Sequence, residues 1–202
     1  MTICIVDANS GNKKSVYNLI KYLNYDVIVS RSFEDITTAT HLILPGVGSY
    51  SEMMSKLKKY NLIDILSNEV LIKKKPFLGI CVGMQVLSTF GYEFEKSAGL
   101  NWIEGIVRKL NTDKLKLPHI GWNNILIQKK DKILNEIDEN SNFYFLHSYV
   151  FETKIINSIV AKTSYGESFP CIINSDNIWG FQFHPEKSQV AGQLILKNFL
   201  KL

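Results

Sequence analysis

The chain has 202 residues, of which 46% are hydrophobic and 21% charged, and its formal net charge is +4. This is the composition of an ordinary globular protein, and the chain has no apolar run of the ~20 residues that a membrane helix needs. The opening residues, MTICIVDANS, lack the pattern of a signal peptide, so we expect a cytoplasmic protein. The lysines are scattered, and their one dense run, KKK at 73–75, ends a predicted helix, so we expect neither a nucleic-acid nor a membrane partner.

Through the first hundred residues, short apolar runs alternate with helical patterns. Strands are predicted at 2–7, 26–30, 41–45 and 76–81, with a turn at 10–12. One predicted helix carries Val16, Leu19, Ile20 and Leu23 on one face, and residues 50–74 are predicted helical with a break near Asn61. Strands that alternate with helices favour right-handed crossovers and a parallel sheet.

After residue 100 the pattern changes to strands with little helix between them. They are predicted at 103–110, 119–128, 143–152, 158–165 and 178–184, followed by a final helix at about 188–201. Such a series favours antiparallel pairing. We therefore expect one α/β domain over residues 1–202, with a mixed central sheet that is parallel in its first half and more antiparallel in its second.

Residues 79–83, GICVG, have the G-x-C-x-G form of a nucleophile elbow, a sharp turn from a strand into a helix. Such a turn lifts the thiol of Cys81 out of the strand, and a helix start favours its thiolate. The backbone amide of Val82 would face a developing oxyanion. The alternative is that Gly79, Cys81 and Gly83 only let the strand and helix pack closely, and an elbow needs a base to act as a nucleophile.

His184 is the histidine best placed to be that base. Pro185 forces it into an extended conformation, and residues two apart in an extended chain point the same way. Glu186 can then hold the imidazole in one tautomer and stabilise its charged form. The sequence predicts Cys81, His184 and Glu186 as nucleophile, base and orienting carboxylate of an acyl-transfer site.

The remaining histidines and cysteines are expected to be structural. We predict His41 at the surface or a sheet edge, and His119 and His147 as hydrogen-bonded residues in aromatic strands. Cys4 and Cys171 lie in apolar runs and are expected in the core. Because the cysteines form no C-x-x-C pair, we expect free thiols and neither a metal site nor a cofactor.

The loop LPGVGSY, residues 44–50, follows the third strand and contains two glycines. Parallel sheets bind ligands at the carboxyl ends of their strands, where this loop and Cys81 both fall. The loop is too short for a phosphate-binding loop, and we expect it to supply a second oxyanion donor. A peptide flip in this loop could present or withdraw that amide.

PGVG, GICVGMQ and GFQFHPEKSQ, in this order and spacing, resemble the class I (triad) glutamine amidotransferases. The segments DANSGN, LPHIGWN and FYFLHSYV extend the resemblance over nearly the whole chain and make it most similar to the glutaminase subunits of imidazole glycerol phosphate synthases. The resemblance implies a flavodoxin-like amidotransferase fold. It also implies hydrolysis of L-glutamine through a cysteine thioester.

The resemblance further implies roles for particular residues. It implies that ammonia passes to a (βα)8-barrel synthase subunit in a heterodimer, which makes imidazole glycerol phosphate and AICAR in histidine biosynthesis. The positions that match oxyanion or glutamine-binding residues are Val47, Gly48, Val82, Gln85, Ser148 and Tyr149. The positions that match the partner interface are Asn12, Trp122 and Lys187. Without the resemblance, Trp122 would more often be a core residue, because it is an aromatic residue in an apolar strand.

Two stretches depart from the commonest pattern of these subunits. Residues 7–12 read DANSGN where D-Y-G-x-G-N is usual, and residues 88–102, STFGYEFEKSAGLNW, replace an acidic run. An alternative is therefore a paralogous glutaminase that supplies ammonia for amidine formation on a surface-glycan sugar. A stand-alone cysteine hydrolase and a binding subunit without catalytic activity are two further hypotheses.

Overall fold

The computed structural model describes residues 1–10, 12–112 and 114–202, and its central feature is an eight-stranded sheet with the strand order β2-β1-β3-β4-β14-β13-β12-β9. The turn predicted at 10–12 includes Gly11, which lies outside the described residues. The strands of the large sheet are β1 (Thr2–Val6), β2 (Asp26–Ser30), β3 (His41–Gly46), β4 (Phe77–Cys81), β9 (Leu126–Ile127), β12 (Ile159–Tyr165), β13 (Glu167–Ser175) and β14 (Ile178–Phe181).

The large sheet is mixed, as predicted. β2, β1, β3, β4 and β14 are parallel, whereas β13, β12 and β9 pair antiparallel. β14 belongs to the last part of the chain but lies beside β4, with Gly180 opposite Gly79. This crossover brings the segment after β14, which contains His184, next to the end of β4, where Cys81 lies.

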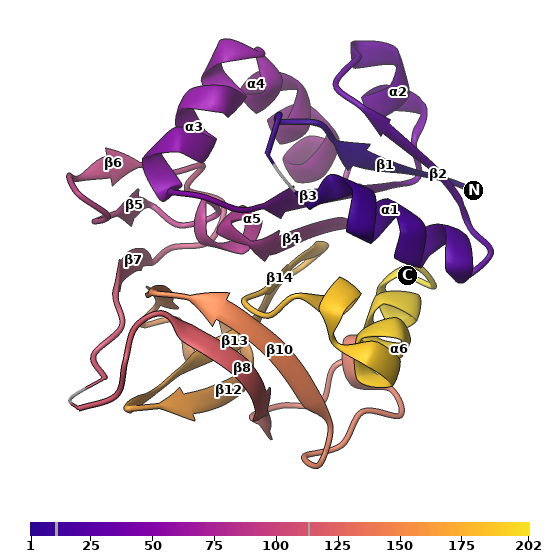
Figure 1. The fold of residues 1–202 in the computed structure, drawn as a ribbon. Helices are drawn as coiled ribbons and strands as arrows, with labels where there is room; N and C mark the ends of the chain where they lie inside the picture. Colours follow the sequence, from indigo (N-terminus) through magenta and orange to yellow (C-terminus); the bar gives the residue numbers. More distant parts are fainter. Residues whose placement is uncertain (11, 113) are drawn as a thin grey trace.

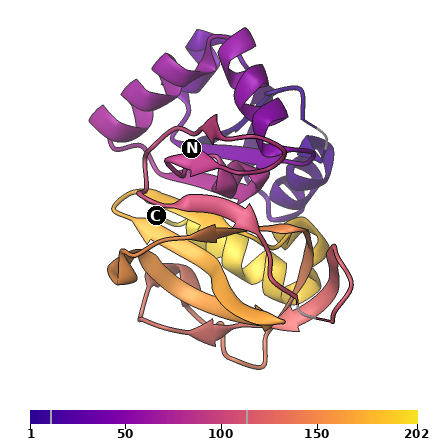
Figure 2. The same ribbon diagram turned by 90° about the vertical axis from the view of Figure 1, so that its left-hand side faces the viewer.

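The described residues also form two smaller sheets (Figure 1, Figure 2). β10 (Asn142–His147) pairs with β8 (His119–Asn124). The second small sheet has the strand order β11-β7-β5-β6. Its strands are β11 (Tyr149–Glu152), β7 (Ile106–Lys109), β5 (Phe90–Gly91) and β6 (Ser97–Ala98). β10 and β11 are separated only by Ser148, so the chain passes from one small sheet to the next there.

Helices α1 to α4 surround the parallel strands, and α6 lies beside the antiparallel half near the C-terminus (Figure 1). Val16 and Ile20 form the buried face of α1. β3 and β4 are buried along their whole length, as a parallel strand covered on both faces requires. The helices are α1 (Lys13–Tyr22), α2 (Phe33–Thr38), α3 (Tyr50–Lys59), α4 (Leu62–Ser67), η1 (Asn68–Ile72), α5 (Val82–Gln85), η2 (Lys132–Leu134), η3 (Ile156–Ser158), η4 (Pro185–Lys187) and α6 (Gln189–Phe199).

The sequence did not predict several elements of the structure, of which two have six or more residues. One is the short helix α2, which begins where Ser32 accepts a hydrogen bond from the backbone of Asp35. The second is β13, whose interior contains Pro170, a residue that argues against a central strand because it lacks an N–H. A register shift between β12 and β13 skips Cys171, the residue after this proline, so the ladder is irregular beside the position that lacks a donor.

His41 is buried, not at the surface or a sheet edge as predicted. β3 lies between β1 and β4, and the ring of Phe199 from α6 packs edge-on against the imidazole at 5.5 Å. Burial lowers the pKa of His41 to about 4.

Within the described residues, every helix is too short or too polar to cross a bilayer.

The lysine run at 73–75 is engaged within the protein. Lys73 and Lys75 form ion pairs with the buried carboxylate of Glu69, and Lys74 pairs with Asp176. Lys75 also donates to the carbonyls of two residues in α2. The run therefore joins the end of the helical segment to its neighbours, which is a more specific role than the complement to a helix dipole that the sequence predicted.

Candidate active site

Cys81 lies at the tip of a strained strand-to-helix turn. Its backbone has φ 55° and ψ −111°, a conformation that residues with a side chain rarely adopt. A Cβ on Gly83 would lie 1.9 Å from the carbonyl oxygen of Leu44, and one on Gly79 would lie 2.4 Å from the carbonyl oxygen of Gly83. Both glycines are therefore required by the turn itself. The following helix, α5, has only four residues.

The structure brings His184 and Glu186 together as predicted, although by a different backbone route. His184 is extended, but Glu186 lies in the single 3₁₀ turn of η4 and not in an extended chain. Its Oε1 is 2.7 Å from Nδ1 of His184, and both side chains are almost completely buried. Pro185 therefore sets the conformation of the histidine, and the turn that it begins returns the carboxylate to the ring.

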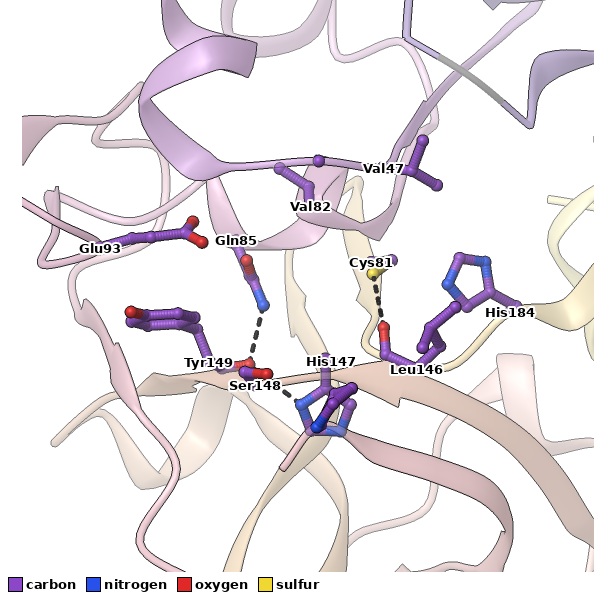
Figure 3. Close-up of a pocket in the computed structure, with 12 residues that line it drawn as sticks. Val47, Cys81, Val82, Gln85, Glu93, Leu146, His147, Ser148, Tyr149 and His184 are labelled. Atoms are coloured by element: carbon purple, nitrogen blue, oxygen red, sulfur yellow. Dashed lines mark hydrogen bonds between the residues drawn. The ribbon is translucent and has the colours of Figure 1, made fainter. Parts of the chain in front are cut away.

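The second ring nitrogen of His184 is directed at the thiol side of the site (Figure 3). Nε2 is buried, and Cys81 is the group that acts on this side of the ring. Burial lowers the pKa of His184, but hydrogen bonding and charge from Cys81 and Glu186 outweigh burial and raise the pKa to about 10. A charged imidazole beside a cysteine is the arrangement found around activated cysteine nucleophiles.

Asn12 contacts the same pair of side chains. Its Nδ2 lies 3.3 Å from Nδ1 of His184 and donates to Oε1 of Glu186. Asn12 precedes α1 with a left-handed backbone, φ 68°, and is partly buried. The sequence prediction placed this residue at the partner interface, and the structure adds that it lies against the base and its orienting carboxylate.

The thiol opens into a pocket of about 210 Å³ (Figure 3). All six residues predicted for the oxyanion and glutamine sites line it, together with four that the sequence did not identify. The lining consists of Val47, Gly48, Cys81, Val82, Gln85, Glu93, Pro118, Leu146, His147, Ser148, Tyr149 and His184. The carboxylate of Glu93 is the most informative addition, because it supplies negative charge beside Gln85 and Tyr149, away from the thiol. It lies in the segment 88–102, which carries no motif from which the site could have been recognised.

The predicted oxyanion loop is tied to a serine near the N-terminus. The N–H of Val47 donates to Oγ of Ser10 at 2.9 Å, and the same hydroxyl donates to the carbonyl of Val47 at 3.1 Å. The amide of Val47 is therefore already occupied and is not presented to the pocket. Gly48 follows with φ +97°, a conformation in which glycine is strongly favoured.

His119 and His147 form a neutral pair, of which His147 lines the pocket. Nδ1 of His147 lies 3.0 Å from the carbonyl of Tyr149, so this nitrogen carries the proton, and Nε2 then accepts from Nδ1 of His119 at 3.1 Å. Burial lowers the pKa of His147 to about 3 and that of His119 to about 4. Both residues are thus hydrogen-bonded structural histidines, as predicted.

Trp122 and Lys187 lie at the surface near the site. Trp122 on β8 is 47% exposed, so it is not a core aromatic residue, and it packs edge-on against Tyr144 of β10. The ammonium of Lys187 lies 5.5 Å from the centre of the same tyrosine ring. Ile120, also on β8, is 57% exposed. These residues form an exposed, partly apolar surface on the β8–β10 sheet.

The described part of the chain contains no group of three or more His, Cys, Asp or Glu side chains that is arranged to hold a metal ion. The chemistry that the site can perform with its own groups is nucleophilic. It has a thiol at an elbow, a buried imidazole held by a carboxylate, and a pocket that leads to the sulfur.

Comparison with known proteins places these features in context. Residues 4–202 match the family described as Glutamine amidotransferase class-I. The imidazole glycerol phosphate synthase subunit HisH of Leptospira interrogans is 43% identical over 204 residues, covering 99% of this chain and 100% of that protein. Subunit HisH of Pelagibacter ubique is 42% identical over 208 residues, covering 100% of both chains.

Solved structures agree on the fold. A crystal structure of a glutamine amidotransferase superposes with a TM-score of 0.77 at 17% identity, covering 98% of this chain and 97% of the matched chain. The structure of PurLQS from Thermotoga maritima superposes with a TM-score of 0.76 at 15% identity, covering 99% of this chain and 97% of the matched chain.

Proposed function

The chain belongs to the class-I glutamine amidotransferases, and on that premise we propose that it is the glutaminase subunit of an imidazole glycerol phosphate synthase. The observation that carries the proposal is Cys81, held in a left-handed backbone at the end of β4 in one pocket with His184, whose Nδ1 is bound by Glu186. The relatives named as subunits of that synthase are about two-fifths identical over nearly the full length of the chain, which supports the pathway.

In the proposed reaction, the thiolate of Cys81 attacks the side-chain amide carbon of L-glutamine. The C–N bond breaks, and the imidazolium of His184 gives its proton to the leaving nitrogen, so ammonia departs and a glutamyl thioester remains. Neutral His184 then takes a proton from water, whose oxygen attacks the thioester. Glutamate leaves, and the thiolate–imidazolium pair is restored while Glu186 keeps the ring in one orientation.

The oxyanion that forms in each step requires backbone donors. The N–H of Val82 is the first candidate because it follows the nucleophile directly, as an elbow requires. The segment Val47–Gly48 is the second, once the amide of Val47 leaves Ser10. With the Val47 amide bound to Ser10, the site would be only partly assembled, which supports an activity that is gated by a partner.

The pocket supports recognition of an amino-acid substrate. The carboxylate of Glu93 can accept hydrogen bonds from an α-ammonium group, and the oxygen of the Gln85 side chain faces the same end of the pocket (Figure 3). Ser148, which lies between β10 and β11, and Tyr149, the first residue of β11, also line the pocket. The thiol of Cys81 and the carboxylate of Glu93 lie at different ends of the pocket, which suits a substrate whose reacting amide and α-ammonium lie at opposite ends (Figure 3).

We propose that ammonia passes to a (βα)8-barrel synthase subunit docked on the face formed by Trp122, Lys187 and Asn12. The exposure of Trp122 and Ile120 supports this surface as a place of contact. We also propose that residues 1–202 form one domain, because β14 is inserted between β4 and β13 and so joins the two halves in a single sheet.

The experiment that tests the proposal measures glutamate release from glutamine by the purified chain, first alone and then with the barrel subunit plus the ribonucleotide acceptor from the same organism. A large increase with both present supports the proposal. No increase, with Cys81 still labelled by a glutamine-analogue electrophile, would retain the glutaminase chemistry and reject the pathway. The sugar-amidination alternative would then be the next to test, although the relatives from Leptospira and Pelagibacter do not favour it.

A further inference from the structure

A second glutamine, Gln182, lies against the thiol in the interior of the protein. It follows β14 and is completely buried, with Nε2 at 3.8 Å from Sγ of Cys81. This distance is within the range of a hydrogen bond to sulfur. The proposed reaction does not use Gln182, and a buried polar side chain that contacts a reacting atom calls for an explanation.

Hydrogen bonds fix the orientation of the Gln182 amide. The carbonyl of Tyr149 can only accept, so Gln85 must direct its Nε2 at this oxygen, which lies 2.9 Å away. Nε2 of Gln85 also donates to Oε1 of Gln182 at 3.1 Å. Because the oxygen of Gln182 is engaged there, its nitrogen faces the sulfur. The side-chain amide is thus a donor toward Cys81 and not an acceptor.

The backbone holds Gln182 in place as well. Its N–H donates to the carbonyl of Cys171 at 2.9 Å, beside the register shift in β13. β14 is also paired with β4, where Phe181 lies opposite Ile80, so the next residues, Gln182 and Cys81, fall at the same edge of the sheet. The strand pairing therefore places Gln182 beside the nucleophile.

Two groups with opposite preferences contact the sulfur. The carbonyl of Leu146 lies 3.8 Å from Sγ and can only accept a hydrogen bond, so it favours the protonated thiol. The amide of Gln182 can only donate to the sulfur, so it favours the thiolate. The two contacts therefore act in opposite directions on the sulfur, in addition to the effect of the imidazole of His184.

We propose that Gln182 is a positioning residue for the nucleophile: its side-chain amide donates to Sγ of Cys81, holds the sulfur at the pocket edge and stabilises the thiolate. The proposal rests on the proposed function in that Cys81 is the nucleophile. Since the amide carries no ionisable proton, it stabilises the thiolate without competing with His184 for the proton that is transferred in the reaction.

The test compares Gln182→Met, which keeps the length of the side chain and removes the amide, with Gln182→Glu, which keeps its shape and replaces the donor by an acceptor. The exposed Gln128, which donates to the carbonyl of Leu126, is changed to Met as the matched control. The rate of Cys81 alkylation by iodoacetamide is measured by peptide mass spectrometry over a range of pH from acid to alkaline, together with kcat and KM for glutamine.

We expect the midpoint of Cys81 alkylation to rise by about one pH unit in Gln182→Met, a roughly tenfold loss of thiolate below the midpoint, because a hydrogen bond to the charged form is lost. Gln182→Glu should raise it further, since a carboxylate would repel the thiolate. In both variants kcat should fall about tenfold with little change in KM, because the substrate-binding groups remain. Gln128→Met should match the native protein.

An unchanged alkylation midpoint in either folded variant, as judged by thermal unfolding, would overturn the proposal. If Gln182→Met does not fold, Gln182→Glu decides the result on its own, because it keeps the contact with Gln85. The midpoint shift is independent of glutamine turnover. Thus a shifted midpoint in a protein that never hydrolyses glutamine would support the role of Gln182 and reject the proposed function.

Discussion

Ser10 holds the predicted oxyanion loop in the form that the structure shows, and its removal should increase the basal activity. In the native protein, one hydroxyl bonds both the N–H and the carbonyl of Val47, at 2.9 and 3.1 Å. Ser10 is almost completely buried, with 5% of its surface exposed. We therefore expect Ser10→Ala to release the Val47 peptide without exposing new surface, so that the peptide can turn its N–H toward the pocket.

The size of the effect follows from the two hydrogen bonds. Each neutral bond contributes about 1 kcal/mol, so the loss of both shifts the balance toward the released peptide by about 1–2 kcal/mol, or roughly 5–30-fold in population. If the released form carries the activity and is the minor one, glutamate release should rise by the same factor. The rate with the partner bound should change little, because the partner would already favour the released form.

The assay is the initial rate of glutamate release at saturating glutamine, without any partner, for the native protein, for Ser10→Ala and for the control Ser55→Ala, which changes an exposed serine on α3. Thermal unfolding confirms that each variant is folded. A folded Ser10→Ala protein whose partner-free rate equals or falls below the native rate would refute the reasoning. The Val47 peptide would then have no part in the gating.

Three further predictions concern the triad and its turn. Asn12→Ala should lower kcat about three- to tenfold, with little change in the unfolding temperature, because the carboxylate of Glu186 loses a donor that holds it in place. Steady-state kinetics measure this loss, and an unchanged kcat would mean that Asn12 serves only the interface. Gly83→Ala should lower the free energy of unfolding by about 2–4 kcal/mol in urea titrations, because its Cβ would lie 1.9 Å from the carbonyl oxygen of Leu44; a native-like midpoint would contradict this. Because the pKa of His184 is raised from 6.5 to about 10, the folded state retains a proton that the unfolded state loses, so the free energy of unfolding should fall as pH rises from about 6.5 to about 10. Glu186→Gln should weaken this dependence, and an equally steep profile in the variant would argue against the pairing.

The residues that the sequence identified share a local signal. Cys81 lies between glycines at a strand end, and His184 precedes a proline that restricts its backbone, so each could be placed without knowledge of the fold. Glu186 was placed correctly for a reason that was only partly right, since the turn after Pro185 is 3₁₀ and not extended. The prediction still held because, at a spacing of two residues, both the extended and the 3₁₀ conformation bring the carboxylate of Glu186 to the ring of His184.

The residues that the sequence missed act through contacts between distant segments. Ser10 reaches Val47 across 37 positions and Gln182 reaches Cys81 across 101. Both lie within segments that resemble the family, DANSGN and GFQFHPEKSQ, but neither segment indicates the distant residue that is contacted. Glu93 enters the pocket from a loop without periodicity. Only the pairing of β14 with β4 and the course of the loops bring these groups to the thiol. The fold class could be predicted because alternation of strands and helices is a local property, whereas these contacts are not.

The most direct test of the central claim follows the acyl group on the sulfur. The protein is incubated with isotopically labelled glutamine and quenched in acid, and the peptide that contains Cys81 is analysed by mass spectrometry alongside glutamate release. The proposed mechanism predicts a labelled glutamyl group on Cys81 in the native protein, and neither adduct nor glutamate in a folded Cys81→Ala variant. Continued glutamate release by Cys81→Ala would contradict it, because the hydrolysis would then proceed without the nucleophile on which every step depends.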